Sequence, residues 1–201
     1  MNRKTQFWFK LMVVMTLLVV SLAPVACAAK EQGAYKKLVL REGIAHFSFE
    51  YPSTYDEPTV SPTGRFTSVV SGRKLTGANG NDPVLDIYVT EGGDLRPDAK
   101  TSLEKALNRY ETEIFKDFKL IERSSITVLG VRTEQIVYTY SGGYPGTGIS
   151  DRGIPAPFMG REVFFDYNGM VWNITISSLL EESETARADF EHILQTFKIL
   201  K

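Results

Sequence analysis

The chain of 201 residues holds few side chains that could do nucleophilic, acid–base or metal chemistry. It has one cysteine, Cys27, and two histidines, His46 and His192. Neither histidine has a second ligand at the spacing of a His-x-x-x-His or paired-cysteine metal site. No Gly-x-Ser-x-Gly motif is present to expose a nucleophilic serine. We therefore expect no catalytic site, no metal and no cofactor, with both histidines at the solvated surface and a hydrolase as the least favoured interpretation.

The N-terminal segment has the order of a secretory signal peptide. Arg3, Lys4 and Lys10 form a basic start, residues 11–20 are apolar except for one threonine, and small residues follow. In such a signal the basic end stays in the cytoplasm while the apolar run enters the translocon. We assign residues 1–26 to a signal peptide.

Cys27 stands at the end of this leader, in the sequence APVAC. This sequence resembles the box of bacterial lipoproteins, although Pro24 stands where that family prefers leucine. The resemblance implies that Cys27 receives diacylglycerol, whose acyl chains, such as palmitate, contribute roughly 0.8 kcal/mol of membrane binding per buried CH₂ group. Two alternatives remain. Signal peptidase could cleave at Ala26-Cys27-Ala28 and release a soluble secreted or periplasmic protein, or an uncleaved leader could anchor the chain, because residues 11–29 nearly reach the roughly 20 needed to span a bilayer.

The charge of the remaining chain excludes some partners. Removing residues 1–26 removes three basic residues and no acidic one, which leaves 20 Lys or Arg against 24 Asp or Glu. The formal charge of about −4 argues against a nucleic-acid partner, which requires a basic surface. It also argues against adsorption to anionic lipid by charge alone. We expect a tether over residues 27–36 and one folded domain over residues 37–201, a length that can bury a sizeable core.

Alternating apolar residues predict strands at KLVLRE, HFSFEYP, RFTSVVSG and VLDIYVTE, and two or three strands within KLIERSSITVLGVRTEQIVYTY. The strongest local signal is Asn168-Gly169, which is typical of the type I′ turn of a hairpin. The turn places three cross-strand pairs on one face: Tyr167 with Met170, Phe165 with Trp172, and Val163 with Ile174. The other, polar face of the hairpin holds Glu162, Asp166, Asn173 and Thr175.

Two helices are predicted. Thr101-x-x-Glu104 fits a capping box at the start of the first helix, which we expect to end near Asp117. The second helix is expected from Ser183 to Gln195, followed by a short strand at FKIL. The predicted apolar faces are Leu103, Leu107, Tyr110 and Ile114 in the first helix, and Ala186, Phe190, Ile193, Leu194 and Phe197 in and after the second.

Residues 141–160, SGGYPGTGISDRGIPAPFMG, form a glycine- and proline-rich connection of uncommon length. Tyr144 and Phe158 give it apolar surface, and Asp151 and Arg152 give it charge. Two interpretations remain open. The connection could be a flap that contacts a partner or ligand through these four side chains, or a surface loop with a few residues packed on the sheet.

Hairpins imply an antiparallel sheet, and two amphipathic helices need an apolar sheet surface to cover. The predicted fold class is therefore α+β, a mainly antiparallel twisted sheet packed against two helices. The segments HFSFEYPSTY, ITVLGVRTEQIVYTY and VFFDYNGMVWNITISS, with the closing TFKI, resemble PsbP-like proteins, whose sandwich is shared with the Mog family. The resemblance covers roughly residues 38–200. It implies a non-enzymatic accessory domain, often tethered by lipid and sometimes attached to photosynthetic complexes.

These observations lead to one expected function and one alternative. We expect a non-enzymatic, membrane-tethered, extracytoplasmic accessory or interaction module of a bacterial cell. Its expected partners are the membrane, through the lipid anchor, and a membrane protein complex. The alternative is a ligand-binding lipoprotein in which the 141–160 loop closes over a small apolar pocket.

Overall fold

The computed structural model describes residues 35–62, 65–72, 83–92, 97–141 and 157–201. The chain divides after Gln32 into two units, and all described residues belong to the second. The predicted signal peptide, Cys27 and most of the predicted tether lie outside the described residues. The first strand, β1 (Tyr35–Leu40), already contains the last two residues that the sequence assigned to the tether. Among the described residues, no helix combines the length and apolar character needed to cross a bilayer.

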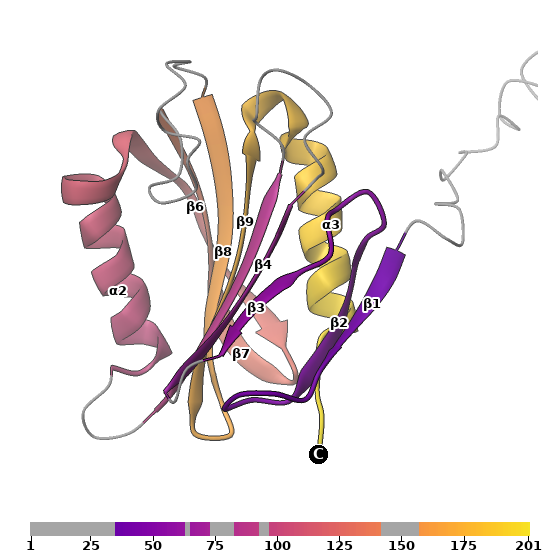
Figure 1. Ribbon diagram of the computed structural model, residues 1–201. Helices are drawn as coiled ribbons and strands as arrows, with labels where there is room; N and C mark the ends of the chain where they lie inside the picture. Colours follow the sequence, from indigo (N-terminus) through magenta and orange to yellow (C-terminus); the bar gives the residue numbers. More distant parts are fainter. Residues whose placement is uncertain (1–34, 63–64, 73–82, 93–96, 142–156) are drawn as a thin grey trace, which may run out of the picture. The chain divides into compact units, whose positions relative to one another are not determined.

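Seven strands form an antiparallel sheet in the order β3-β4-β5-β9-β8-β7-β6 (Figure 1). Their bounds are β3 (Thr59–Pro62), β4 (Phe66–Gly72), β5 (Val84–Glu91), β6 (Lys116–Val128), β7 (Val131–Ser141), β8 (Pro157–Tyr167) and β9 (Met170–Leu179). β3 is absent from the sequence prediction because it is a short edge strand flanked by prolines. β7 ends at Ser141 and β8 begins at Pro157, so the predicted connection 141–160 is too long by its first residue and its last four.

The predicted β8–β9 hairpin is confirmed with its register. Asn168 and Gly169 have φ angles of 52° and 73°, as a type I′ turn requires. The three expected pairs, Tyr167–Met170, Phe165–Trp172 and Val163–Ile174, are all present. Leu129 and Gly130 form a second tight turn with positive φ angles, 53° and 80°, between β6 and β7. A two-residue turn fixes which side chains share a face, and the β8–β9 hairpin therefore determines which residues lie on each face of the sheet.

A second sheet of three strands has the order β1-β2-β10. β2 (Phe47–Pro52) is its centre, and β10 (Lys198–Ile199) is the short strand predicted at FKIL. The helix α3 (Ser183–Thr196), preceded by the 3₁₀ turn η3 (Leu180–Glu182), contacts both β2 and β9. Phe47 and Phe49 of β2 are fully buried, as the alternation predicts.

The helix α2 (Ala99–Arg109) corrects the predicted capping box. Its N-cap is Asp98, whose carboxylate accepts a hydrogen bond from the backbone N–H of Thr101. An N-cap carboxylate binds the N–H of the third helical residue, so Thr101 is inside the helix rather than before it. The helix also ends earlier than predicted, because a π-helical turn, η1 (Tyr110–Ile114), follows Arg109 and β6 begins at Lys116.

The two helices lie on opposite sides of the seven-stranded sheet (Figure 1). α3 and the three-stranded sheet cover one face, where they enclose a large cluster around Phe47, Trp172 and Phe190. α2 and η1 lie on the other face, over β8 and β9, where a smaller aromatic cluster forms around Tyr110, Tyr138 and Phe164. The described part of the chain is thus the α+β sandwich that the sequence predicts.

Candidate functional site

Part of the sheet face that carries α2 is exposed to solvent. α2 packs over β8 and β9, and the same face continues across β5 and β4. In β4 and β5 the side chains alternate strictly, with Val69 and Ile87 fully buried on the α3 side. The opposite side chains include Phe66, Val70 and Tyr88, which we call the sheet patch.

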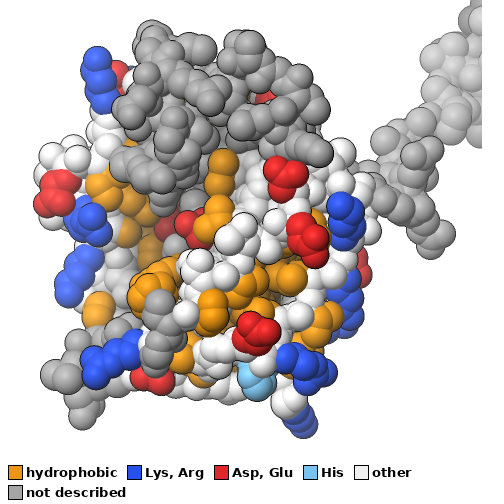
Figure 2. Space-filling model, viewed as in Figure 1, with side chains coloured by type: hydrophobic (Ala, Val, Ile, Leu, Met, Phe, Trp, Pro, Cys, Tyr) orange, Lys and Arg blue, Asp and Glu red, His pale blue; other side chains and the backbone are white. Residues whose placement is uncertain are grey.

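The sheet patch exposes apolar area. Tyr88 and Val70 are 38% and 40% exposed, and the rings of Phe66 and Tyr88 lie 5.3 Å apart. Figure 2 shows hydrophobic side chains at the surface in the region of β3 and β4. Aromatic and aliphatic side chains that remain exposed together on a rigid sheet are suited to contact with another apolar surface.

A carboxyl group borders the sheet patch. Asp86 pairs with Val70 across the strands, one position beyond Tyr88 on the same face. Burial raises the pKa of Asp86 to about 6. Its Oδ1 atom has no hydrogen-bond partner within the described part of the chain. Asp86 is therefore a weak acid that titrates close to neutral pH.

A second carboxyl group lies deeper on the same face, under α2 and η1. Glu162 is 1% exposed. Glu162 and Asp86 lie in one row across the sheet, on either side of Thr175, because Asp86 pairs with Thr175 and Thr175 pairs with Glu162. The hydroxyl of Tyr110 donates to Glu162 at 2.9 and 3.1 Å, and Nδ2 of Asn173 donates at 2.6 Å. The carboxyl group is thus enclosed by donors from η1 and β9.

Burial raises the pKa of Glu162 to about 7. The hydrogen bonds from Asn173, Tyr110 and Thr175 act in the opposite direction, and the nearby charge of Asp86 adds to the rise. Because loss of solvation exceeds the gain from the hydrogen bonds, the neutral form is favoured more than in water. Glu162 can therefore take up or release a proton near neutral pH, but it is closed off from solvent.

A glycine leaves space for one of the aromatic rings beside Glu162. Gly160 of β8 pairs with Tyr138 of β7, and any Cβ at position 160 would collide with the Tyr138 ring. The Tyr138 hydroxyl lies 3.5 Å from Glu162, and its ring lies 5.3 Å from that of Tyr110. The missing side chain at Gly160 thus allows Tyr138 to lie flat on the sheet beside the carboxyl group.

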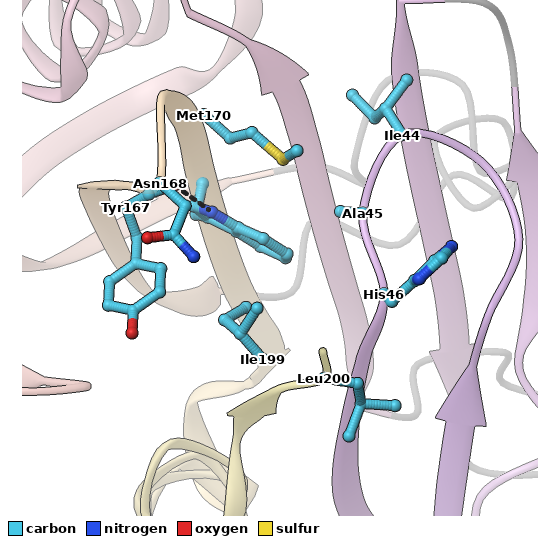
Figure 3. Close-up of a pocket in the computed structure, with 9 residues that line it drawn as sticks. Ile44, Ala45, His46, Tyr167, Asn168, Met170, Ile199 and Leu200 are labelled. Atoms are coloured by element: carbon cyan, nitrogen blue, oxygen red, sulfur yellow. Dashed lines mark hydrogen bonds between the residues drawn. The ribbon is translucent and has the colours of Figure 1, made fainter.

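A small pocket of about 210 Å³ lies elsewhere, at the tip of the β8–β9 hairpin. Its apolar lining comes from three parts of the chain, and its polar lining includes His46 and Asn168. Figure 3 shows the segment before β2, the hairpin and the C-terminal end meeting around it. The nine lining residues are Ile44, Ala45, His46, Tyr167, Asn168, Met170, Trp172, Ile199 and Leu200. The pocket has room for one apolar side chain or a small ligand.

The two histidines differ in their surroundings. His46 is exposed just before β2, as expected. His192 is half-buried rather than solvated: its Nε2 atom lies 3.0 Å from Glu50, and its ring stacks on Tyr35 at 3.6 Å. These contacts hold β1 and β2 against α3, so His192 has a packing role.

The predicted site residues are mostly outside the described residues. Cys27, Tyr144, Asp151 and Arg152 fall there, and their roles stay predictions. Phe158 lies in β8, is 6% exposed, and stacks on Tyr140 at a ring distance of 5.4 Å. The structure does not bring Phe158 to the surface of the described part of the molecule.

Sequence reasoning did not single out Glu162 or Asp86. Glu162 was placed on the polar face of the hairpin, and a polar strand face is usually solvated. The available signal was the first helix, whose apolar face with Tyr110 needs a sheet surface to cover. Combining that face with the polar side of the hairpin would have predicted a buried carboxyl group.

No protein-family model and no curated protein matches the sequence. Solved structures do match. LpqN, involved in cell envelope biogenesis of Mycobacterium tuberculosis, has 15% identity and a TM-score of 0.52, with 83% of this chain and 92% of that chain covered. Cyanobacterial PsbP (CyanoP) from Synechocystis sp. PCC 6803 has 14% identity and a TM-score of 0.51, with 87% and 97% covered. The Saccharomyces cerevisiae Ran-binding protein Mog1p has 12% identity and a TM-score of 0.49, with 82% and 95% covered.

These similarities concern the fold. The α+β sandwich expected from the resemblance to PsbP-like proteins is confirmed by the strand order and by the similarity to CyanoP. At such low identity, a shared fold does not transfer residues or partners from one protein to another.

Proposed function

We propose that this protein is a non-enzymatic accessory module, tethered outside the cytoplasm by lipid at Cys27, that binds a membrane protein partner through the sheet patch. The observation that carries the proposal is the exposure of Phe66, Val70 and Tyr88 on one rigid sheet face. Such a face presents apolar area without any cost of ordering a loop, and aromatic side chains are enriched at protein interfaces.

The tether is supported by the sequence. A basic start, an apolar run and small residues precede Cys27, the only cysteine of the chain. A protein held at a membrane surface meets membrane proteins at high effective concentration, so a modest patch can be sufficient for binding. LpqN, which shares the fold, is described as involved in cell envelope biogenesis, which is consistent with an extracytoplasmic accessory role.

A non-enzymatic role is supported by the surroundings of the ionisable groups. Glu162 has the pKa of a useful acid or base, but Tyr110, Asn173 and the sheet enclose it. A general acid or base must come within hydrogen-bond reach of a substrate. While η1 is in place, Glu162 cannot contact a substrate.

Binding through the sheet patch is tested by a double variant, Val70→Thr with Tyr88→Thr. Threonine suits a strand and removes most of the apolar area, so the fold should be retained. Crosslinking and pull-down from native membranes should recover a partner with the natural protein and lose it with the double variant. The matched control is Val39→Thr with Leu180→Thr, which removes exposed apolar side chains from other surfaces. Equal loss with the control variant would contradict the proposed site.

The lipid anchor is tested separately. Mass spectrometry of the mature N-terminus should find Cys27 as the first residue, carrying diacylglycerol, and globomycin should block the processing. Cys27→Ala should leave an unprocessed precursor. A mature chain that begins at another residue, or an intact leader in untreated cells, would contradict lipidation while leaving the sheet patch untouched.

A second function, binding of a small apolar ligand, is supported by the pocket of about 210 Å³ in Figure 3. A ligand that prefers the folded state raises the melting temperature. Small aromatic and aliphatic probes should raise the melting temperature of the natural protein, and Leu200→Trp, which fills the pocket, should remove the effect. An unchanged melting temperature with every probe would exclude this alternative.

A further inference from the structure

The helix α2 is attached to the sheet at few points. Of its eleven residues, only Ala99 and Leu103 are buried. The carboxylate of Asp166 binds the backbone N–H of Ala99 at 3.1 Å, and an exposed ion pair of 2.6 Å joins Glu104 to Arg123. A pocket of about 260 Å³ lies between the start of α2 and the strands β7 and β8. α2 is thus less tightly packed than α3, which has four buried residues.

A polar contact joins the C-terminal end of α2 to the sheet. Tyr110 is the first residue of the π turn η1, is 7% exposed, and reaches Glu162 with its hydroxyl. π turns are rare and occur often at functional sites, because they shift the side chains that follow a regular helix. Here the π turn lies between α2 and β6, and its backbone closes with the N–H of Phe115 bound to the carbonyl of Tyr110.

Several side chains of the described residues face Glu162. Tyr110 faces it from η1, Tyr138 from β7, Asn173 and Thr175 from β9, and Asp86 from β5. Asp86 is the one charged side chain that acts on Glu162 within the described part of the chain, and its charge has the same sign. Ionised Glu162 therefore has hydrogen-bond donors but no cation, beside a second carboxylate in a buried site.

We propose that a proton on Glu162 holds η1 and the C-terminal half of α2 against the sheet, and that loss of this proton releases them. The ionised carboxylate gains solvation when water reaches it, and Tyr110 is the side chain of η1 that covers it. The hydrogen bonds from Tyr110 and Asn173 favour the ionised form, but they do not offset its burial. Release of η1 would expose the rings of the smaller aromatic cluster, including Tyr138 and Phe164. This switch does not depend on the proposed partner or on the lipid anchor.

The test is hydrogen exchange of backbone amides in the full-length chain, purified in detergent, between pH 5 and 8. Protection factors are corrected for the intrinsic pH dependence of exchange, and the amides of α3 serve as the internal reference. Protection of the amides from Leu103 to Ile114 should fall about tenfold or more as pH rises, because a displacement of the pKa by one unit changes an equilibrium tenfold. Protection in α3 should change much less.

Three variants make the test specific. Glu162→Gln keeps the size and one acceptor oxygen and cannot ionise, and its amide N–H can donate to the Tyr110 hydroxyl, so protection of η1 should be high and independent of pH. Asp86→Asn removes the like charge that raises the pKa of Glu162, so the fall in protection should be smaller and should be complete at a lower pH. Glu111→Gln, at an exposed glutamate beside Tyr110, is the matched control and should behave as the natural protein does.

The outcomes separate the proposal from simple loss of stability. Equal loss of protection in α3 and α2 would overturn it, because the whole domain would then be opening. Retention of the pH dependence in Glu162→Gln would also overturn it. Tyr110→Phe, which keeps the ring, should lower the protection of η1 already at pH 5, and unchanged protection there would show that the hydroxyl does not hold this segment.

Discussion

The two faces of the seven-stranded sheet bury different chemistry. The face toward α3 is mostly apolar, and its buried side chains include Leu85, Ile87, Val89, Val163, Phe165, Trp172, Ile174 and Ile176. The face toward α2 contains Glu162 and Thr175 among aromatic rings, with Asp86 at the border of the exposed sheet patch. Apolar burial stabilises a fold at every pH, whereas a buried carboxyl group makes stability depend on pH.

This difference separates two tasks within one domain. The α3 side joins elements that are far apart in the sequence, since Phe47 of β2 and Phe197 after α3 both contact Trp172 at ring distances near 5 Å. The α2 side also joins distant elements, since Tyr110 of η1 reaches Glu162 of β8, but α2 itself contributes only two buried residues. We infer that the α3 side fixes the fold and that the α2 side carries the parts that can move or bind.

The largest expected effect comes from the α3 side. Trp172→Ala should lower the free energy of unfolding by roughly 3–5 kcal/mol, because it leaves a cavity among Phe47, Phe165 and Phe197. Chemical denaturation should give the same loss at pH 5 and pH 8, since the three side chains that line this cavity are aromatic and do not titrate. Trp172→Phe, which keeps a ring, should lose less. A loss of unfolding free energy that differs strongly between pH 5 and pH 8 would contradict the view that the α3 side stabilises the fold independently of pH.

The next effect comes from the α2 side and depends on pH. Burial raises the pKa of Glu162 to about 7 in the folded protein, above its ordinary value of 4.5. Because the folded state binds the proton more tightly than the unfolded chain, the stability that Glu162 contributes is fully present below pH 4.5 and is lost as pH rises to about 7. The loss should reach up to about 3 kcal/mol for this group, and Asp86 should add a loss in the same direction.

Denaturation curves at several pH values measure this loss. Glu162→Gln should remove most of the decline and should be more stable than the natural protein at pH 8. At pH 4.5 the two should be nearly equal, because the natural carboxyl group is then protonated when folded. A natural protein that gains stability between pH 5 and pH 7 would show that Glu162 is not the dominant titrating group.

The same contrast explains what sequence reasoning could predict. Strand alternation and the Asn168-Gly169 turn gave the register of β8 and β9, because a two-residue turn leaves one arrangement of the side chains. The polar side of that hairpin was not recognised as buried, since a polar strand face has the same pattern under solvent and under a helix. Whether α2 covers that face depends on contacts between distant elements, such as Tyr110 with Glu162, which periodicity does not contain.

A smaller effect concerns the start of α2. Asp98→Ala removes the side-chain acceptor for the N–H of Thr101 and should lower the melting temperature by about 2–4 °C. Thr101→Ala leaves that backbone contact intact and should change the melting temperature little. Hydrogen bonding to Thr101 lowers the pKa of Asp98, so the effect of the substitution should shrink in acid, where the carboxylate is protonated. A larger effect of Thr101→Ala than of Asp98→Ala would support the capping box predicted at Thr101 over an N-cap at Asp98.

The smallest effect on stability is expected at the sheet patch, where it is most informative. In the double variant Val70→Thr with Tyr88→Thr, each substitution should change the free energy of unfolding by no more than about 0.5 kcal/mol. Both side chains are exposed, and threonine favours strands. Denaturation of the variant and the natural protein side by side measures this difference. A loss of several kcal/mol would mean that the patch belongs to the core, and the apolar exposure would then have a packing explanation. A small change in stability, combined with loss of the crosslinked partner, would show that the sheet patch serves binding and is not needed for folding.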